Sequence, residues 1–444
     1  MNVGMVSARL RSADGVSIEA AKWEKALERM GFFVYLCAGA ISQPKPTDTI
    51  VPRLECNDSQ IQRLDARLRY DPDHISEEAL RELHECPDGI KRELCAFVDT
   101  HGIGLLIIEN LLSLPLNLPA GIAVCELVEE LAVPVIARHH DFYWEREKLV
   151  RGAAAEFIRD HFLPGHPTLV HVVINSAAQR EFRRRHGIVA TRMPNVFDFE
   201  AMATRDEYNA DFRNALGIRS DDVVFLQPSR IVPRKRIDRS VELFAAIDAR
   251  LRLRGRRAVL LITGPAHGER EAERTRAEIL SMAATRDLEV RLAADRISIE
   301  RRTDPEKVYS IHDAYVHADV VTFPSDLEGF GNPVIEAAAY RLPLFTNRYP
   351  VLADITRRGF RFVEIDGQLT ADAVDQIWRL VVDPDHRREI TDHNFAVAQR
   401  YFAFPALEIL LSEVCERALI AAQPYVGDGA QGVRQTAWRT GRRP

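Results

Sequence analysis

The chain has 444 residues, of which 46% are hydrophobic and 28% charged, with a formal net charge of −6. This length corresponds to about two or three domains, each able to bury an ordinary core. An acidic balance is not typical of a general nucleic-acid binder, whose surface is usually basic. No run reaches the ~18 apolar residues of a membrane span, and the start of the chain lacks a signal-peptide pattern. We therefore expect a cytoplasmic protein without stable membrane insertion.

Six cysteines are spread along the chain, and none forms a C-x-x-C pair. No histidine cluster lies near them at the spacing of a zinc site, so no metal site is predicted. We expect mostly reduced core thiols. The six are Cys37, Cys56, Cys86, Cys95, Cys125 and Cys415.

Short apolar runs alternate with longer amphipathic stretches almost throughout the chain. Runs of Val, Ile and Leu without alternation indicate strands that are buried on both faces. The strands predicted in the first half cover residues 2–8, 32–39, 104–110, 134–140 and 169–175. Those predicted in the second half cover residues 223–229, 258–264, 290–295, 320–325 and 342–347.

Strands that alternate with helices predict parallel sheets with helices on both faces. Two such series indicate an α/β chain of two doubly wound, Rossmann-like domains. The predicted N-terminal domain covers residues 1–198, with a helical insertion at about 57–101, and the predicted C-terminal domain covers residues 199–394. Helices over 395–422 are expected to return to the N-terminal domain. Residues 423–444 are expected to form a flexible tail rich in Gly and Arg.

The most informative stretch is "DLEGFGNPVIEAAA", residues 326–339, which follows a predicted strand. In open parallel sheets, ligands bind at the carboxyl ends of the strands. Asn332 is expected as a helix N-cap and Pro333 as the first helical residue. The exposed N–H groups of such a helix start favour an anion, and Gly329 and Gly331 let the backbone approach it.

Two carboxylates flank this predicted anion site. Glu328 projects from the loop, and Glu336 is expected in the first turn of the helix. Because carboxylates accept hydrogen bonds from hydroxyls, the stretch predicts a ligand of the sugar–diphosphate–ribose type.

A basic stretch, "PSRIVPRKRID", follows the strand predicted at 223–229. Arg230 and Lys235 should lie at the carboxyl edge of the same sheet, where two cations can neutralise a pyrophosphate leaving group. Arg234, Arg236 and Arg239 are expected to be solvated.

Together these motifs resemble the family 4 retaining glycosyltransferases of the GT-B fold. The E-x7-E motif is Glu328 to Glu336, and the R-x4-K motif is Arg230 to Lys235. The looser N-terminal likenesses are "ADGVSIEA" (13–20), "ARHHDFYWER" (137–146) and "MPNVFD" (193–198). The resemblance implies two parallel sheets that face each other across a cleft.

The resemblance also implies a role for each matched position. Glu336 would hold the ribose hydroxyls of the nucleotide, and Glu328 the hydroxyls of the donor sugar. The implied nucleotide-sugar site is Gly15, Arg230, Lys235, Glu328, Gly329, Phe330, Gly331, Asn332, Pro333, Val334 and Glu336. The implied catalytic residues are His140, Glu328, Arg230 and Lys235. Two departures are Asn332, where leucine is common, and Arg236, where glycine usually follows the lysine.

The function implied is metal-independent, retaining transfer of a hexose to a hydroxyl of a small soluble acceptor or glycan. GDP-mannose and UDP-glucose are the candidate donors, and no other cofactor is expected. Residues 107–117 and the segment around His140 resemble those of transferases that mannosylate small solutes such as glucosylglycerate. The alternatives are a sugar-nucleotide epimerase or hydrolase of the same fold, or a non-catalytic nucleotide-sugar-binding subunit.

Other candidate residues have two interpretations each. His140 either contacts the reacting centre or is a satisfied polar residue, and His139 is a weaker candidate. The aromatic stretch 142–145 either stacks on a sugar or packs within its loop. The D-x-D sequences at 70–74 and 382–386 contain proline and are interpreted as turns, with Asp385 as a helix cap.

Overall fold

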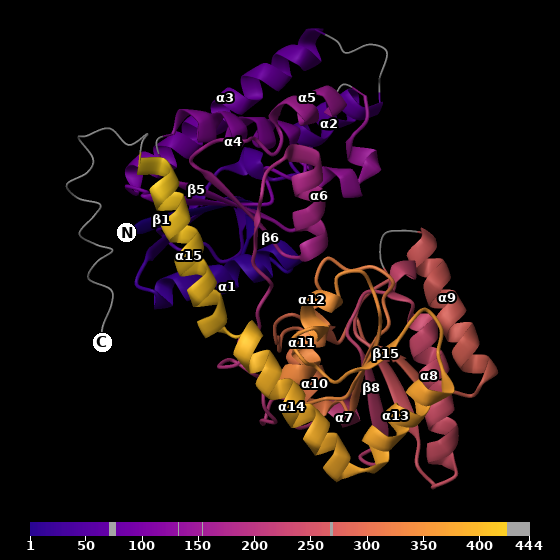
Figure 1. The fold of residues 1–444 in the computed structure, drawn as a ribbon. Helices are drawn as coiled ribbons and strands as arrows, with labels where there is room; N and C mark the ends of the chain where they lie inside the picture. Colours follow the sequence, from indigo (N-terminus) through magenta and orange to yellow (C-terminus); the bar gives the residue numbers. More distant parts are fainter. Residues whose placement is uncertain (71–76, 132, 153, 267–269, 424–444) are drawn as a thin grey trace, which may run out of the picture. The chain divides into compact units, whose positions relative to one another are not determined.

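The computed structural model describes residues 1–70, 77–131, 133–152, 154–266 and 270–423. The predicted tail and most of the turn at 70–74 lie outside these residues. The chain divides into two compact units (Figure 1). Unit 1 comprises Met1–Pro194 and the chain from Pro405 onward, and unit 2 comprises Asn195–Phe404. The division between the units thus falls at 194/195, where the sequence analysis placed it at 198/199, and the chain returns to unit 1 at Pro405.

The described part of unit 1 contains one parallel sheet with the strand order β3-β2-β1-β4-β5-β6-β7. Each strand predicted in this half is present, whereas the two-residue strands β3 and β7 were not foreseen. The strands are β1 (Asn2–Leu10), β2 (Phe33–Ile41), β3 (Thr49–Ile50), β4 (Leu105–Glu109), β5 (Val135–His139), β6 (Leu169–Val173) and β7 (Thr191–Arg192).

Helices cover both faces of this sheet. On one face, α3 and α4 bury residues such as Phe97 and Leu127 against β1 and β4. On the other face, the Arg138 guanidinium lies 4.3 Å from the ring centroid of Trp23 in α1. The helices are α1 (Gly15–Arg29), α2 (Ser59–Tyr70), α3 (Glu77–Thr100), α4 (Leu118–Glu130), α5 (Ala154–His161), α6 (Ser176–His186) and α15 (Phe404–Ala422). An ion pair of 2.6 Å between Arg29 and Glu408 joins α15 to α1.

The described part of unit 2 contains a second parallel sheet, with the order β10-β9-β8-β13-β14-β15. Its strands are β8 (Val223–Gln227), β9 (Ala258–Ile262), β10 (Val290–Leu292), β13 (Val320–Phe323), β14 (Leu344–Asn347) and β15 (Val363–Ile365). The short strands β11 (Ile297–Ser298) and β12 (Tyr309–Ser310) pair with each other. The strand order reverses between β8 and β13, and that is where ligands bind in doubly wound sheets.

Figure 1 shows α8 and α9 on one side of this sheet and α10 and α11 on the other. The first face is closed by apolar residues of α8, α9 and α13, including Phe244, Ile279 and Ile377. The helices are α7 (Phe212–Ala215), α8 (Ile237–Arg252), α9 (Arg270–Thr285), α10 (Ile311–His317), α11 (Asn332–Ala339), α12 (Ala353–Thr356), α13 (Ala371–Val382) and α14 (Pro384–Phe402). The N-cap of α14 is Asp383, so the prediction of Asp385 as the cap was wrong.

Every cysteine in the sequence is a free thiol, with Cys56 and Cys95 half-buried and the other four buried. Within the described residues, no helix is long and apolar enough to cross a bilayer. The same residues contain no group of three or more His, Cys, Asp or Glu side chains placed to hold a metal ion.

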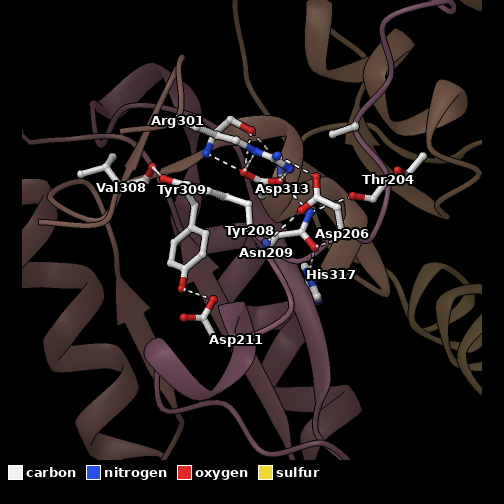
Figure 2. A network of polar contacts seen from close by, with 12 residues as sticks. Thr204, Asp206, Tyr208, Asn209, Asp211, Arg301, Val308, Tyr309, Asp313 and His317 are labelled. Atoms are coloured by element: carbon white, nitrogen blue, oxygen red, sulfur yellow. Dashed lines mark hydrogen bonds and ion pairs between the residues drawn. The ribbon is translucent and has the colours of Figure 1, made fainter. Parts of the chain in front are cut away.

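A polar network around the buried Asp313 and Asn209 fixes the start of α10 (Figure 2). Ser310 is the N-cap of this helix, and the Asp313 carboxylate completes a capping box by accepting hydrogen bonds from the backbone and side chain of Ser310, both at 2.8 Å. It also accepts from Asn209 Nδ2 at 2.8 Å and from Arg301 Nε at 3.0 Å. A second nitrogen of Arg301 bonds Asp206 at 2.7 Å, so the segment before β8 is tied to α10.

Burial alone would raise the pKa of Asp313, but the hydrogen bonds from Arg301, Asn209 and Ser310 outweigh it and lower the pKa to about 2. We expect Asp313→Asn to destabilise unit 2 by about 2 kcal/mol at pH 7. The folded pKa lies below the unfolded one, so this contribution is complete above about pH 4 and lost as the pH falls toward 2. Scanning calorimetry should show that the difference in unfolding free energy between wild type and variant is about half as large at pH 3 as at pH 7.

The matched control is Asp392→Asn, which removes a carboxylate that pairs with Arg341 at 2.8 Å and is 52% exposed. An exposed ion pair of this kind contributes about 0–1 kcal/mol, so its loss should be small at every pH. A gap for Asp313→Asn that stayed constant from pH 7 to pH 3 would show that its cause is not the carboxylate charge.

Candidate functional site

The loops that follow β8 and β13 meet at the carboxyl edge of the unit 2 sheet. The Asp326 N–H donates to the Arg234 carbonyl at 2.9 Å. The Asp326 carboxylate accepts from Arg236 at 3.1 Å and from Arg239 at 2.5 Å. The prediction that these arginines are solvated was wrong for Arg239, whose partner is supplied by the acidic loop of the neighbouring strand. Arg234 is exposed, as predicted, and Arg236 is half-buried and bonded to the same loop. The Arg239 side chain is only 7% exposed.

Lys235 and Glu328 form the central ion pair of this edge. Lys235 Nζ lies 2.5 Å from Glu328 Oε1, and the side chains are 10% and 9% exposed. Arg234 donates to Glu328 Oε2 at 3.0 Å and to the Leu327 carbonyl at 2.7 Å. Burial and, to a smaller extent, the neighbouring arginines lower the pKa of Lys235, while Glu328 opposes that shift. The two residues, which were predicted to contact different parts of a ligand, therefore contact each other.

Arg230 is exposed at the same edge. Its loop is supported by the turn after β9, where the Pro265 carbonyl accepts from the Ile231 N–H at 3.0 Å. A Cβ at Gly264 would lie 2.4 Å from the Arg230 nitrogen, so only glycine fits there. The close packing of these two turns positions the backbone of Arg230.

Arg236 occupies a position where the glycosyltransferases that this chain resembles usually have glycine. It adopts φ +47° and ψ +47°, the left-handed conformation, and serves as the N-cap of α8. Glycine adopts this conformation most readily, which explains the usual residue. In this chain the Arg236 side chain instead pairs with Asp238 at 2.7 Å and with Asp326.

The helix α11 begins one residue earlier than predicted. Gly331, with φ +108°, is the N-cap, and Asn332 is the first helical residue. Asn332 does not cap the helix, because its Oδ1 accepts from Asn195 Nδ2 at 3.0 Å. Pro333 is therefore the second helical residue. Glu336 had been expected in the first turn of the helix but lies beyond it. Gly331 brings no side chain to the helix start, so the backbone N–H groups there remain the natural partners of an anion.

The backbone around Gly331 is held by Tyr349. The Tyr349 hydroxyl donates to the Phe330 carbonyl at 3.0 Å, and its side chain is buried. A Cβ at position 331 would lie 2.0 Å from this hydroxyl. The second glutamate, Glu336, is half-buried and accepts from the Tyr315 hydroxyl at 2.6 Å. The sequence analysis identified neither tyrosine, although both lie within or beside the segments it singled out.

In unit 1, Gly15 is the exposed first residue of α1, after β1. A Cβ there would meet nothing within 4 Å, so the unit itself does not require glycine. The Asp14 carboxylate caps this helix by accepting from the Val16 and Ser17 N–H groups, both at 3.0 Å. The role of Gly15 in approaching a diphosphate stays a prediction.

His140, at the end of β5, is held from two sides. Its Nε2 lies 2.9 Å from Glu109 Oε2, and its backbone N–H donates to Asn110 Oδ1 at 2.9 Å. Burial would raise the pKa of Glu109, but the charge of Arg138 and the contact with His140 lower it below its usual value. An ionised Glu109 keeps a proton on Nε2 and leaves Nδ1 for another partner. Glu109 and Asn110 were missed as supports, although a carboxylate at the end of an apolar strand was a usable signal.

His139 points into the core, as strand alternation requires. Its Nε2 lies 2.9 Å from His171 Nδ1, and the two rings stack at 5.2 Å. Burial lowers the pKa of His139 well below its usual value. In the aromatic stretch, the buried Phe142 stacks on Trp144 at 4.3 Å, so these two rings pack within their own loop.

Comparison with known proteins identifies the class. Residues 209–395 match the family described as glycosyl transferases group 1. Anabaena Alr3699/HepE in complex with UDP and glucose has a similar fold, with a TM-score of 0.62 and 14% identity over 94% of this chain and 99% of that one. Sucrose-phosphate synthase from Thermosynechococcus elongatus also has a TM-score of 0.62, with 17% identity over 95% of this chain and 100% of that one.

Two relatives match this chain over most of its length and most of their own. This chain belongs to the group 1 glycosyltransferases of GT-B fold. These enzymes are nucleotide-sugar-dependent transferases. The relative from Petrotoga mobilis is 31% identical over 82% of this chain and 86% of its own length. The relative from Thermotoga maritima is 30% identical over 93% of this chain and 99% of its own length. Each of these relatives is a mannosylglucosylglycerate synthase.

The geometry at Gly331 predicts a large effect for a single methyl group. Gly331→Ala should lower the unfolding temperature of unit 2, because it combines a left-handed conformation with the contact to Tyr349. We expect about 1–2 kcal/mol from the conformation and about 1–3 kcal/mol more from the contact. Gly359→Ala is the matched control, because it has a similar φ of +101° but nothing within 4 Å of the added Cβ. Equal losses in calorimetry would contradict the role of Tyr349.

Proposed function

We propose that this chain is a retaining, family 4 mannosyltransferase whose acceptor is a small soluble hydroxyl compound of the glucosylglycerate type. The observation that carries the proposal is the Lys235–Glu328 pair beside the glycine-capped start of α11. The pair lies at the switch point of the unit 2 sheet, beside the backbone N–H groups of the α11 start and the exposed Arg230, and this combination supports binding of a sugar diphosphate. The proposed acceptor is supported by the similarity to two mannosylglucosylglycerate synthases, which match over 82% and 93% of this chain.

In this proposal, the donor diphosphate binds between the α11 start and the cations of the β8 loop. Arg230 is exposed and able to reach an anion, and Lys235 already carries its charge at the edge. Their positive charge and the helix dipole would stabilise the negative charge that grows on the departing diphosphate.

The reaction breaks the bond between the anomeric carbon of the sugar and the diphosphate oxygen. The acceptor oxygen forms its bond to the same carbon on the same face, and its proton passes to the departing diphosphate. Glu328 would bind hydroxyls of the transferred sugar, and Glu336 would bind those of the ribose. The catalytic part of His140 and the approach of Gly15 stay predictions of the family resemblance.

The test is an assay for transfer. GDP-mannose and UDP-glucose are each incubated with glucosylglycerate, and product and free sugar are measured by mass spectrometry and the linkage by NMR. We expect mannosyl transfer with an α linkage, since GDP-mannose carries its sugar in the α configuration and the mechanism retains it. Free sugar without a coupled product would support a hydrolase instead, and donor binding without turnover would support a non-catalytic subunit.

Replacement of the two cations tests the site. Arg230→Ala and Lys235→Ala should each lower kcat roughly 10²-fold or more, the scale of losing one preorganised charge. The control Arg379→Ala removes an exposed arginine of α13, which is 63% exposed and pairs at 3.9 Å with Asp383. Its activity should match that of wild type. Near-normal turnover in the double variant of Arg230 and Lys235 would reject the site assignment.

Because protein cations are proposed to neutralise the diphosphate, transfer should continue in excess EDTA. Initial rates with and without chelator, on enzyme dialysed against it, should agree within about twofold. Complete loss that Mn²⁺ or Mg²⁺ restores would contradict the proposed charge stabilisation by Arg230 and Lys235.

A further inference from the structure

Tyr315 makes one polar contact that bears directly on the candidate site. Its side chain is 1% exposed, and its hydroxyl donates to Glu336 Oε2 at 2.6 Å. Burial and the negative charge of Glu336 raise the pKa of this tyrosine well above its usual value, so the hydroxyl keeps its proton. A phenol has a single proton to donate, and here it is committed to one carboxylate oxygen.

This contact orients the Glu336 carboxylate. A carboxylate on a half-buried side chain can rotate about its terminal torsion, which is broad for glutamate. The Tyr315 hydrogen bond fixes that rotation and leaves Oε1, whose two lone pairs can accept from two hydroxyls. Two vicinal hydroxyls require such a fixed plane more than one hydroxyl does, because both must meet the same carboxylate at good angles.

The position of Tyr315 is itself fixed by the surrounding structure. Its ring stacks on Tyr340 at 5.2 Å with an interplanar angle of 11°, and the Tyr340 hydroxyl accepts from the Ala203 N–H at 3.1 Å. Tyr315 belongs to α10, whose start is held by the network of Asp313 and Arg301 shown in Figure 2. A helix fixed at its start and a ring stacked on its neighbour leave the hydroxyl little freedom.

We propose that Tyr315 is a positioning residue that orients Glu336 toward the ribose 2′- and 3′-hydroxyls and thereby sets the discrimination between ribose and 2′-deoxyribose nucleotides. This inference rests on the proposed ribose-binding role of Glu336. Tyr315 is buried, so it acts through Glu336 and does not itself touch the donor. A site built to bond a hydroxyl rejects the analogue that lacks it, and the rejection depends on the fixed position of the acceptor.

The experiment measures the affinities of GDP and 2′-deoxy-GDP by calorimetry, with UDP and 2′-deoxy-UDP in parallel. For wild type, we expect the ribose form to bind at least about tenfold more tightly. Tyr315→Phe should lower that ratio by about fivefold, raise the donor KM and leave kcat within about twofold, because ribose does not change in the reaction. Glu336→Gln should lower the ratio too, and the double variant should show no further loss.

The matched control is Tyr309→Phe in β12. Tyr309 is also buried, and its hydroxyl donates to a carboxylate, Asp211, at 2.8 Å, but it does not touch Glu336. Its loss should leave the ribose ratio unchanged. An equal fall in both tyrosine variants would overturn the inference by showing a general structural effect.

The Glu336→Gln variant separates two proposals, the ribose-binding role of Glu336 and the positioning role of Tyr315. If this variant kept the wild-type ratio and affinity, the proposed ribose site itself would be wrong. If it lost the ratio while Tyr315→Phe kept it, the ribose site would stand and the positioning role of Tyr315 would be rejected.

Discussion

The adjacency of β8 and β13 is the constraint on which the candidate site depends. These strands are neighbours in the sheet but are separated in the chain by four strands, of which β9 and β10 lie on the far side of β8 in the same sheet. Their carboxyl ends therefore bring a basic loop and an acidic loop together. The Lys235–Glu328 pair and the bonds of Asp326 to Arg236 and Arg239 follow from that meeting. Without this strand order, the charges of the two loops would not lie close enough to pair.

The backbone and carboxylate positions of this edge are held by two buried tyrosines and one glycine. Tyr349 holds the backbone at Phe330, Gly264 admits the Arg230 turn, and Tyr315 holds Glu336. Each is a hydrogen bond or a close approach inside a densely packed interior, where a small displacement is costly. Sites built on such supports keep their geometry before a ligand arrives, which reduces the reorganisation needed when charge develops.

At the carboxyl edge of the unit 1 sheet, side chains at the end of one strand likewise hold a residue at the end of the neighbouring strand. Glu109 and Asn110, at the end of β4, hold His140, at the end of the neighbouring β5. Arg138 supplies the charge that keeps Glu109 ionised inside the unit. His139 is the next residue along the chain, yet it lies in the core against His171. The strand β5 ends at His139, so this histidine keeps a buried strand position, whereas His140 lies just after the strand and finds different partners.

The sequence by itself determined the class of fold and most of the candidate residues. Continuous apolar runs and their alternation with helices are local properties, so each long strand could be predicted from its own residues. The motifs around Glu328 and Arg230 could be located for the same reason, and the residues that needed glycine, such as Gly331, were recognisable. Short strands such as β3 and β7 escaped prediction, because two residues contain no periodic pattern.

Only the tertiary structure decided which partner each polar group finds. Lys235 and Glu328 lie 93 positions apart, and nothing in either local sequence indicates that they pair. The arginines beside them were expected in solvent, yet Arg239 is buried against Asp326, because a neighbouring strand brings that carboxylate within reach. Arg234 is exposed, as expected, but it also bonds a carboxylate of that strand's loop, Glu328. The cap of α11 moved by one residue for a similar reason, since Asn195 engages the side chain that would have capped it. Hydrogen bonds and ion pairs depend on distance in space, and in a doubly wound sheet that distance is set by strand order and not by separation along the chain.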